Sequence, residues 1–201
     1  MTEKSGLPKL LVLIIFAMII LAIMALLVIN QADKSRSKLP SLGNVPFFEY
    51  TERNGQPFGL GDMSGKINIV DFMFTNCKTK CPIMVVNMGS LYDHYSDNEN
   101  IQIVSISVDP ARDSLAALRK YAEEHGVTDN RWVFLRAPVE DVVDLSENGF
   151  MLAADGLPMG HSIKFVLVDW NENIRGYYDG MDAAAMDDII GDIKKLLKEM
   201  P

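Results

Sequence analysis

The sequence predicts an α/β domain that follows a single membrane-spanning helix. Four apolar runs of strand length alternate with helical stretches beyond residue 42. Strands that alternate with helices build a sheet whose faces the helices cover. Before this region lies an uninterrupted apolar run over residues 10–29. The chain of 201 residues is long enough for one such domain and an anchor.

Residues 10–29 have the length of a transmembrane helix. At about 1.5 Å per residue, twenty residues rise roughly 30 Å, which is the thickness of the hydrocarbon core of a bilayer. A cleaved signal peptide usually has a shorter apolar region and a small-residue cleavage site, which the following Asn30-Gln31-Ala32 does not provide. No later cysteine is placed to accept a lipid. We expect a tail over 1–9, an anchor over 10–29 and a polar linker over 30–41.

The charge of the chain is divided between its two parts. Residues 1–40 carry a net charge of +3, and residues 41–201 carry −11. Basic residues lie on both sides of the apolar run, so the positive-inside rule does not decide its orientation. An acidic domain repels the phosphate backbone, which argues against nucleic acid as a partner.

The order of elements predicts the kind of α/β domain. We expect strands over 67–74, 101–108, 132–135 and 163–169, and helices over 82–94, 113–125, 139–147 and 182–200. Asp182 is the expected N-cap of the last helix, and Gly126 ends the second. Residues 45–60 predict a hairpin that turns at Asn54-Gly55, and the last strand pairs with another across 171–173. This arrangement suits a thioredoxin-like domain with an N-terminal β-hairpin over residues 42–201.

The two cysteines of the chain, Cys77 and Cys81, lie four residues apart directly after the first central strand. Proline is favoured at the first position of a helix, so Pro82 predicts that Cys81 caps one. The positive end of a helix favours thiolate, the form that binds metals and attacks disulfides, and Lys78 and Lys80 add positive charge. The pair indicates one local site for redox chemistry, a metal ion or both.

His161 is the candidate for a third ligand, because its loop precedes the fourth strand and lies beside the cysteine turn in a thioredoxin-like sheet. Two thiolates suit Cu(I), and an added imidazole makes a site competent for Cu(II) as well. His94 and His125 lie in predicted helices, where we expect surface or packed side chains.

Three motifs in this order resemble the Sco/SenC family of copper-binding proteins, and the resemblance covers most of residues 42–199. Residues 71–82 read Asp-Phe-Met-Phe-Thr-Asn-Cys-Lys-Thr-Lys-Cys-Pro, residues 105–114 read Ser-Ile-Ser-Val-Asp-Pro-Ala-Arg-Asp-Ser, and residues 161–162 read His-Ser before an apolar strand.

The resemblance implies a thioredoxin fold that holds copper through Cys77, Cys81 and His161. It also implies that the chain supplies copper to, or reduces the thiols of, the dinuclear copper centre of cytochrome c oxidase. The implied partner is the copper-bearing oxidase subunit or another copper protein. The implied location is the bacterial inner membrane, crossed once, with the domain facing the periplasm or cell exterior. Asp109 is an accessory candidate, and its alternative role is that of a turn residue before Pro110.

The chain departs from the family pattern at two places. The family commonly has proline and then an acid after the first cysteine, where Lys78 and Thr79 stand here. Before the histidine it commonly has aspartate, where Gly160 stands here. The added positive charge favours thiolate and opposes a bound cation, so copper affinity and redox potential are expected to differ from those of relatives.

Two functions use the same pair of cysteines. The first is a copper metallochaperone, and the second is a thiol–disulfide oxidoreductase, which has no need of His161. Whether the chain is an enzyme therefore stays open. A peroxidase is disfavoured because Thr75 stands two residues before Cys77, where peroxiredoxins have Thr-x-x-Cys. Methionines can bind Cu(I). We nevertheless expect Met73, Met84 and Met88 to fill gaps in the core, and only Met159, in the loop before His161, stays open as a ligand.

Overall fold

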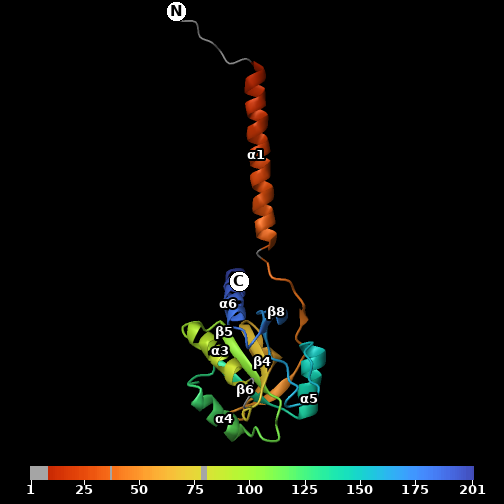
Figure 1. The fold of residues 1–201 in the computed structure, drawn as a ribbon, viewed down its shortest axis with the longest axis vertical. Helices are drawn as coiled ribbons and strands as arrows, with labels where there is room; N and C mark the ends of the chain where they lie inside the picture. Colours follow the sequence, from red (N-terminus) through yellow and green to blue (C-terminus); the bar gives the residue numbers. More distant parts are fainter. Residues whose placement is uncertain (1–8, 37, 78–80) are drawn as a thin grey trace, which may run out of the picture. The chain divides into compact units, whose positions relative to one another are not determined.

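The computed structural model describes the backbone of residues 9–36, 38–77 and 81–201, and the side chains of residues 11–26, 38–77 and 82–201. The chain divides into two compact units, Met1–Lys38 and Leu39–Pro201 (Figure 1). Each unit is described by itself.

The first unit contains helix α1 (Lys9–Arg36). All of its described side chains are exposed. The helix continues seven residues beyond the apolar run and takes in the first part of the expected linker. Neither proline nor glycine interrupts this extension, and the first such residue is Pro40. Within the described part of the chain, no helix combines the length and hydropathy that a membrane span requires.

The second unit is built on one mixed sheet of eight strands in the order β1-β8-β7-β4-β5-β6-β2-β3. Strands β4, β5 and β6 run parallel, and the other pairings are antiparallel. This sheet confirms the predicted strands and the N-terminal hairpin. The strands are β1 (Gly43–Asn44), β2 (Glu49–Glu52), β3 (Pro57–Gly59), β4 (Ile67–Met73), β5 (Ile101–Ser107), β6 (Trp132–Arg136), β7 (Lys164–Val168) and β8 (Asn173–Asp179).

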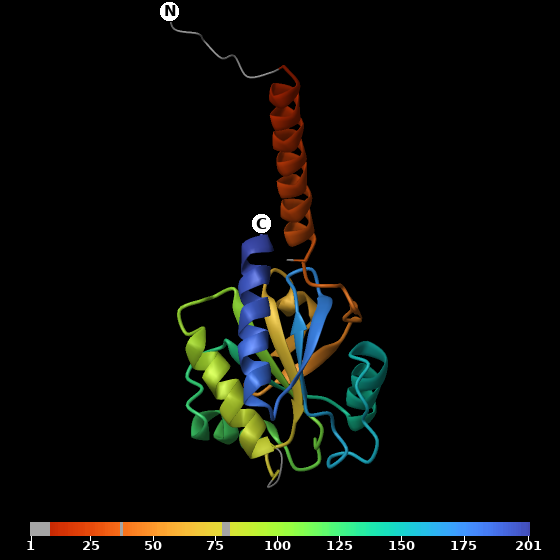
Figure 2. The ribbon, with the colours of Figure 1, turned by 45° about the horizontal axis from the view of Figure 1, so that its top comes forward.

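Helices cover both faces of the sheet, as Figure 2 shows for α3 and α6 on one face and α5 on the other. The helices of the second unit are α2 (Leu60–Met63), α3 (Cys81–His94), α4 (Leu115–Glu124), α5 (Val139–Asp144), the π-helix η1 (Leu145–Gly149) and α6 (Ala183–Glu199). The mixed α/β architecture is therefore as predicted, with α5 ending in a π-helical turn that the sequence did not indicate.

Two hydrophobic cores lie on opposite faces of the sheet. Strand β4 is buried along its whole length, and alternate side chains enter different cores. Val70 and Phe72 enter the hairpin-side core, which also contains residues of the N-terminal hairpin and of α5. Ile69 and Met73 enter the helix-side core, which contains residues of α3, α4 and α6. A strand buried on both faces explains why this run shows no polar alternation.

The helix ends follow from local side-chain chemistry. Ser114 accepts a hydrogen bond from the Ala117 N–H, so it caps α4 and the helix begins two residues later than predicted. Gly126 has a positive φ of 72°, as expected for a residue that ends a helix. Asp182 caps α6 by accepting from the Ala184 N–H, which confirms that prediction. Helix α3 begins at Cys81, one residue before the position predicted from Pro82.

An arginine whose side chain is largely buried fastens the beginning of the second unit to its sheet. Arg175 of β8 donates to the carbonyl oxygens of Leu39 and Pro40 at 2.5 and 3.0 Å. Its guanidinium also pairs with the Asp169 carboxylate at 2.7 Å, and both side chains are at most 10% exposed. Breaking a buried ion pair of this kind is strongly destabilising.

Candidate functional site

The predicted site residues come together at one edge of the sheet. Strands β4 and β5 are parallel, so the segments that follow them leave at the same edge. Strand β7 is antiparallel to β4, so the segment that precedes β7 reaches that edge too. Cys77 follows β4, Asp109 follows β5 and His161 precedes β7. The topology therefore places all three at the same edge.

Cys77 lies in the short turn between β4 and α3. Its side chain is partly exposed and packs against the hairpin-side core. Its N–H donates to the Phe74 carbonyl at 3.4 Å, which closes the turn. Cys81 begins α3, but its side chain lies outside the described residues, as do Lys78, Thr79 and Lys80. The turn thus holds Cys77 just before the N-terminal end of a helix.

His161 is buried beside this turn, with 6% of its surface exposed. Its ring meets the Phe74 ring edge-on, with centroids 5.6 Å apart and planes at 89°. Its Nδ1 lies 2.9 Å from the Ser162 carbonyl oxygen. A carbonyl can only accept, so Nδ1 carries the proton and a neutral ring has its lone pair on Nε2. That tautomer is the one in which Nε2 can bind a metal ion.

Gly160 is required by the shape of the loop that carries His161. A Cβ atom on this residue would lie 1.6 Å from the Asp155 carbonyl oxygen. The Gly160 N–H also donates to the Gly156 carbonyl at 3.1 Å, which closes the loop. The aspartate that the family commonly has at this position would not fit this backbone. The departure noted in the sequence therefore has a steric reason.

Asp109 lies in the loop that follows β5 and is 8% exposed. Its carboxylate pairs with Arg112 at 3.1 Å, and Arg112 itself is largely exposed. Its carbonyl oxygen accepts from the N–H groups of Arg112 and Asp113, as in a compact turn. These contacts account for Asp109 as a turn residue, and its accessory role toward a metal stays a prediction.

Asp113 is a residue of this edge that the sequence interpretation passed over. It is completely buried, and its carboxylate accepts from the Thr75 and Ser107 hydroxyls, each at 2.6 Å. Burial raises the pKa of Asp113, while the hydrogen bonds from Ser107 and Thr75 act in the opposite direction. Asp113 belongs to the motif over residues 105–114, but the sequence alone does not indicate that its side chain turns toward Thr75.

Asp71 is a second buried acid that was passed over as a functional candidate. It lies in the middle of β4, and burial raises its pKa to about 7, although a hydrogen bond from Ser105 lowers it. Ser105 Oγ donates to Asp71 Oδ1 at 2.5 Å and accepts from Trp132 Nε1 at 2.9 Å. A single acid within an apolar strand was the available signal in the sequence.

The remaining histidines and methionines behave largely as predicted. His94 and His125 are exposed, and each ring contacts a neighbouring tyrosine. Met159, for which no core role is expected, is 60% exposed in the loop before His161. Among the described side chains, no three His, Cys, Asp or Glu converge as a metal-binding group. The expected core methionines are at most 4% exposed, and they are Met73, Met84 and Met88.

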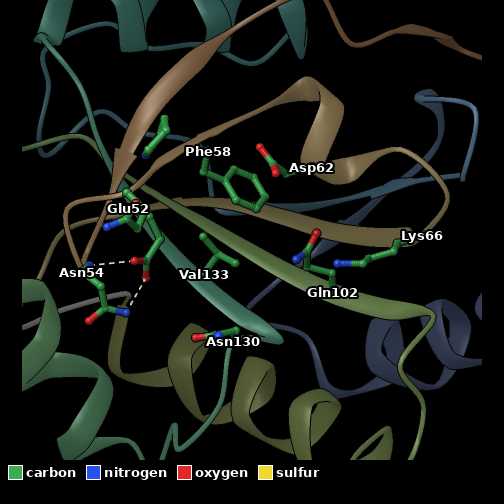
Figure 3. Close-up of a pocket in the computed structure, with 10 residues that line it drawn as sticks. Glu52, Asn54, Phe58, Asp62, Lys66, Gln102, Asn130 and Val133 are labelled. Atoms are coloured by element: carbon green, nitrogen blue, oxygen red, sulfur yellow. Dashed lines mark hydrogen bonds between the residues drawn. The ribbon is translucent and has the colours of Figure 1, made fainter.

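A separate pocket lies at the other end of the parallel strands. Figure 3 shows Lys66, which precedes β4, and Gln102 of β5 extending toward each other in its wall. At its opposite side the Asn54 N–H donates to the Glu52 carboxylate at 2.6 Å. The pocket contains none of the predicted site residues. Lys66 and Gln102 lie where β4 and β5 begin, whereas Cys77 and Asp109 follow the ends of these strands.

A family model described as SCO1/SenC matches residues 40–198. The SCO1 protein homolog of Bacillus subtilis is 29% identical over 153 residues, which is 73% of this chain and 79% of that protein. The residues that the family model matches include every strand of the sheet and both sequence motifs that contain the candidate ligands.

Solved structures show the same fold. BsSco, described as a member of the Sco family of cytochrome c oxidase assembly proteins with a disulfide switch, matches with a TM-score of 0.71 and 28% identity. That match covers 80% of this chain and 98% of the other. Yeast Sco1 with copper bound matches with a TM-score of 0.60 and 25% identity, over 77% and 90% of the two chains.

Proposed function

Because the chain belongs to the SCO1/SenC family, we propose that it is a membrane-anchored copper metallochaperone for cytochrome c oxidase. In this proposal Cys77, Cys81 and His161 hold one copper ion as cargo. The chain delivers that ion to the copper-bearing oxidase subunit, or matures the dinuclear copper site there. Asp109 is an accessory residue of the same edge.

The contact between His161 and Phe74 carries the proposal. It brings a buried imidazole, with its lone pair on Nε2, against the turn that leads to Cys77. Two thiolates and an imidazole are a suitable donor set for both Cu(I) and Cu(II). A site that worked with cysteines alone would not need a histidine fixed in this tautomer.

Copper loading of the full chain, purified in a mild detergent and reduced, tests the proposal. We expect one Cu(II) per chain and an intense visible absorption from sulfur-to-copper charge transfer. Serine in place of Cys77 should abolish that absorption, whereas alanine in place of the exposed His125 should leave it unchanged. A parent chain that takes up no copper, or copper without sulfur-to-copper absorption, would contradict the proposal.

Thiol–disulfide exchange is the second candidate function. Cys77 is partly exposed in the turn after β4, where a partner disulfide can reach it. Its thiolate would attack that disulfide and form a mixed disulfide, and Cys81 would then release the partner as a dithiol. The test uses a His161→Ala chain that has lost copper. If this chain still reduces a partner disulfide as fast as the parent does, thiol–disulfide exchange is favoured over copper delivery.

We propose further that residues 10–29 anchor the chain in the bacterial cytoplasmic membrane, with the domain outside the cytoplasm. The described side chains of α1 are apolar on every side and exposed, as in a helix that lipid surrounds. The full chain should stay with membranes after washing at alkaline pH, and a chain that lacks residues 1–38 should not. Release of the full chain by the same wash would rule out this anchor.

A further inference from the structure

We propose that Asp113 is the positioning residue of the site: its buried carboxylate holds the Cys77 turn and the Asp109 loop in one fixed arrangement. The proposal rests on the proposed function, since it concerns the same edge of the sheet. In this proposal Asp113 does not contact the metal. It influences copper binding and thiol reactivity indirectly, because it fixes the positions of Thr75 and Ser107.

The first set of contacts joins Asp113 to the cysteine turn. The Thr75 hydroxyl donates to Asp113 Oδ1 at 2.6 Å. The Thr75 N–H lies 3.3 Å from both carboxylate oxygens. Thr75 stands two residues before Cys77. In the described part of the turn, the Cys77 N–H donates to the Phe74 carbonyl over a longer distance, 3.4 Å. Asp113 therefore supplies the shortest hydrogen bond described in this turn.

The second set of contacts joins the same carboxylate to the Asp109 loop. The Ser107 hydroxyl donates to Asp113 Oδ2 at 2.6 Å and accepts from the Asp109 N–H at 3.2 Å. The Asp113 N–H donates to the Asp109 carbonyl at 2.8 Å. One carboxylate thus connects two loops that are far apart in the sequence but lie side by side at the end of β4 and β5.

The local sequence leaves the Asp113 side chain available for this connection. An aspartate just before a helix commonly caps it, but here Ser114 is the cap of α4. The described contacts of the Asp113 carboxylate are with uncharged hydroxyl and N–H groups. A buried carboxylate held this way orients its donors strongly, because each donor would otherwise stay unsatisfied.

Four variants of the full chain test the proposal. Thr75→Val removes the hydroxyl and keeps the shape of the side chain, and Thr75→Ser restores a hydroxyl. Asp113→Ala removes the whole connection. Asp169→Asn is the control at the opposite edge, where Asp169 is an equally buried carboxylate that organises the turn between β7 and β8. Because Asp169 also pairs with Arg175, its variant is compared only where circular dichroism shows it folded.

Thr75→Val and Asp113→Ala should weaken Cu(II) binding by about tenfold or more and shift the sulfur-to-copper absorption, as loss of an outer partner of a metal site does. Thr75→Ser and Asp169→Asn should keep the parent's copper affinity and absorption. The proposal is wrong if Thr75→Val, still folded, binds copper with the parent's affinity and spectrum. It is also wrong if Asp169→Asn, still folded, changes them as much.

A metal-free measurement separates this inference from the proposed function. In a Cys81→Ser background Cys77 is the single thiol of the chain. Its rate of alkylation by iodoacetamide is followed against pH, with and without Thr75→Val. A shifted pH profile supports positioning by Asp113 even if the parent binds no copper, and superimposable profiles refute it.

Discussion

Alanine in place of His161 is expected to weaken Cu(II) binding by more than about 100-fold, because loss of an outer partner of a metal ligand alone costs 10- to 100-fold. The same variant should still form a disulfide between Cys77 and Cys81, since the imidazole takes no part in joining the sulfurs. If the variant loses copper but still forms the disulfide, copper binding and thiol–disulfide exchange can be measured separately, although both use the same two cysteines.

Competition titration with a chelator of known affinity measures the copper loss, and mass spectrometry after mild oxidation measures the disulfide. Alanine in place of His125 is the matched control, because that histidine is exposed on α4's C-terminal side and away from the site. Cu(II) binding by His161→Ala at the parent's affinity would remove the imidazole from the ligand set.

Asparagine in place of Asp71 is expected to stabilise the chain at neutral and alkaline pH. Burial raises the pKa of Asp71 to about 7 in the folded state, against roughly 3.9 in an unfolded chain. The stabilising effect of the protonated carboxyl is complete below about pH 4 and is lost as the pH rises through 7. Three pKa units correspond to about 4 kcal/mol of unfolding free energy. Asparagine does not ionise and can still accept from Ser105, so it avoids this loss.

Urea denaturation at pH 4, 6 and 8 measures the effect. Between pH 4 and 7 the Asp71→Asn chain should show a smaller fall in unfolding free energy than the parent. Gln in place of Glu123, an exposed carboxylate on α4, is the control and should follow the parent curve. Parallel curves for the parent and Asp71→Asn would mean that Asp71 is already ionised throughout this range.

Local patterns were sufficient to predict most elements of the fold. The run that became β4 is apolar on both faces, and such a run fits a strand that helices cover. Asn54-Gly55 predicted a turn, and Gly55 adopts the positive φ of 87° that glycine tolerates. The strand β1 and the π-helix η1 escaped prediction, because their pairing and shape depend on distant neighbours and not on periodicity.

The placement of Cys77 and His161 at one edge of the sheet could be predicted from the sequence, but the groups that surround them could not. Cys77 was recognisable from its position before a helix, and His161 from its motif. The interaction of Phe74 with His161 joins residues 87 positions apart, and that of Thr75 with Asp113 joins residues 38 apart. Neither pairing leaves a periodic trace in one sequence, since it depends on how the strands are ordered in the sheet.

The contacts of Arg175 with Leu39 and Pro40 have a mechanical consequence. A pull on the chain from the N-terminal side of residue 39 would reach Arg175 first, through its two hydrogen bonds to the backbone. Arg175 passes the load to Asp169 and, through β8, to the neighbouring strand β7. The force would therefore spread over paired strands of the sheet, and the first residues of the domain would resist being pulled away from it.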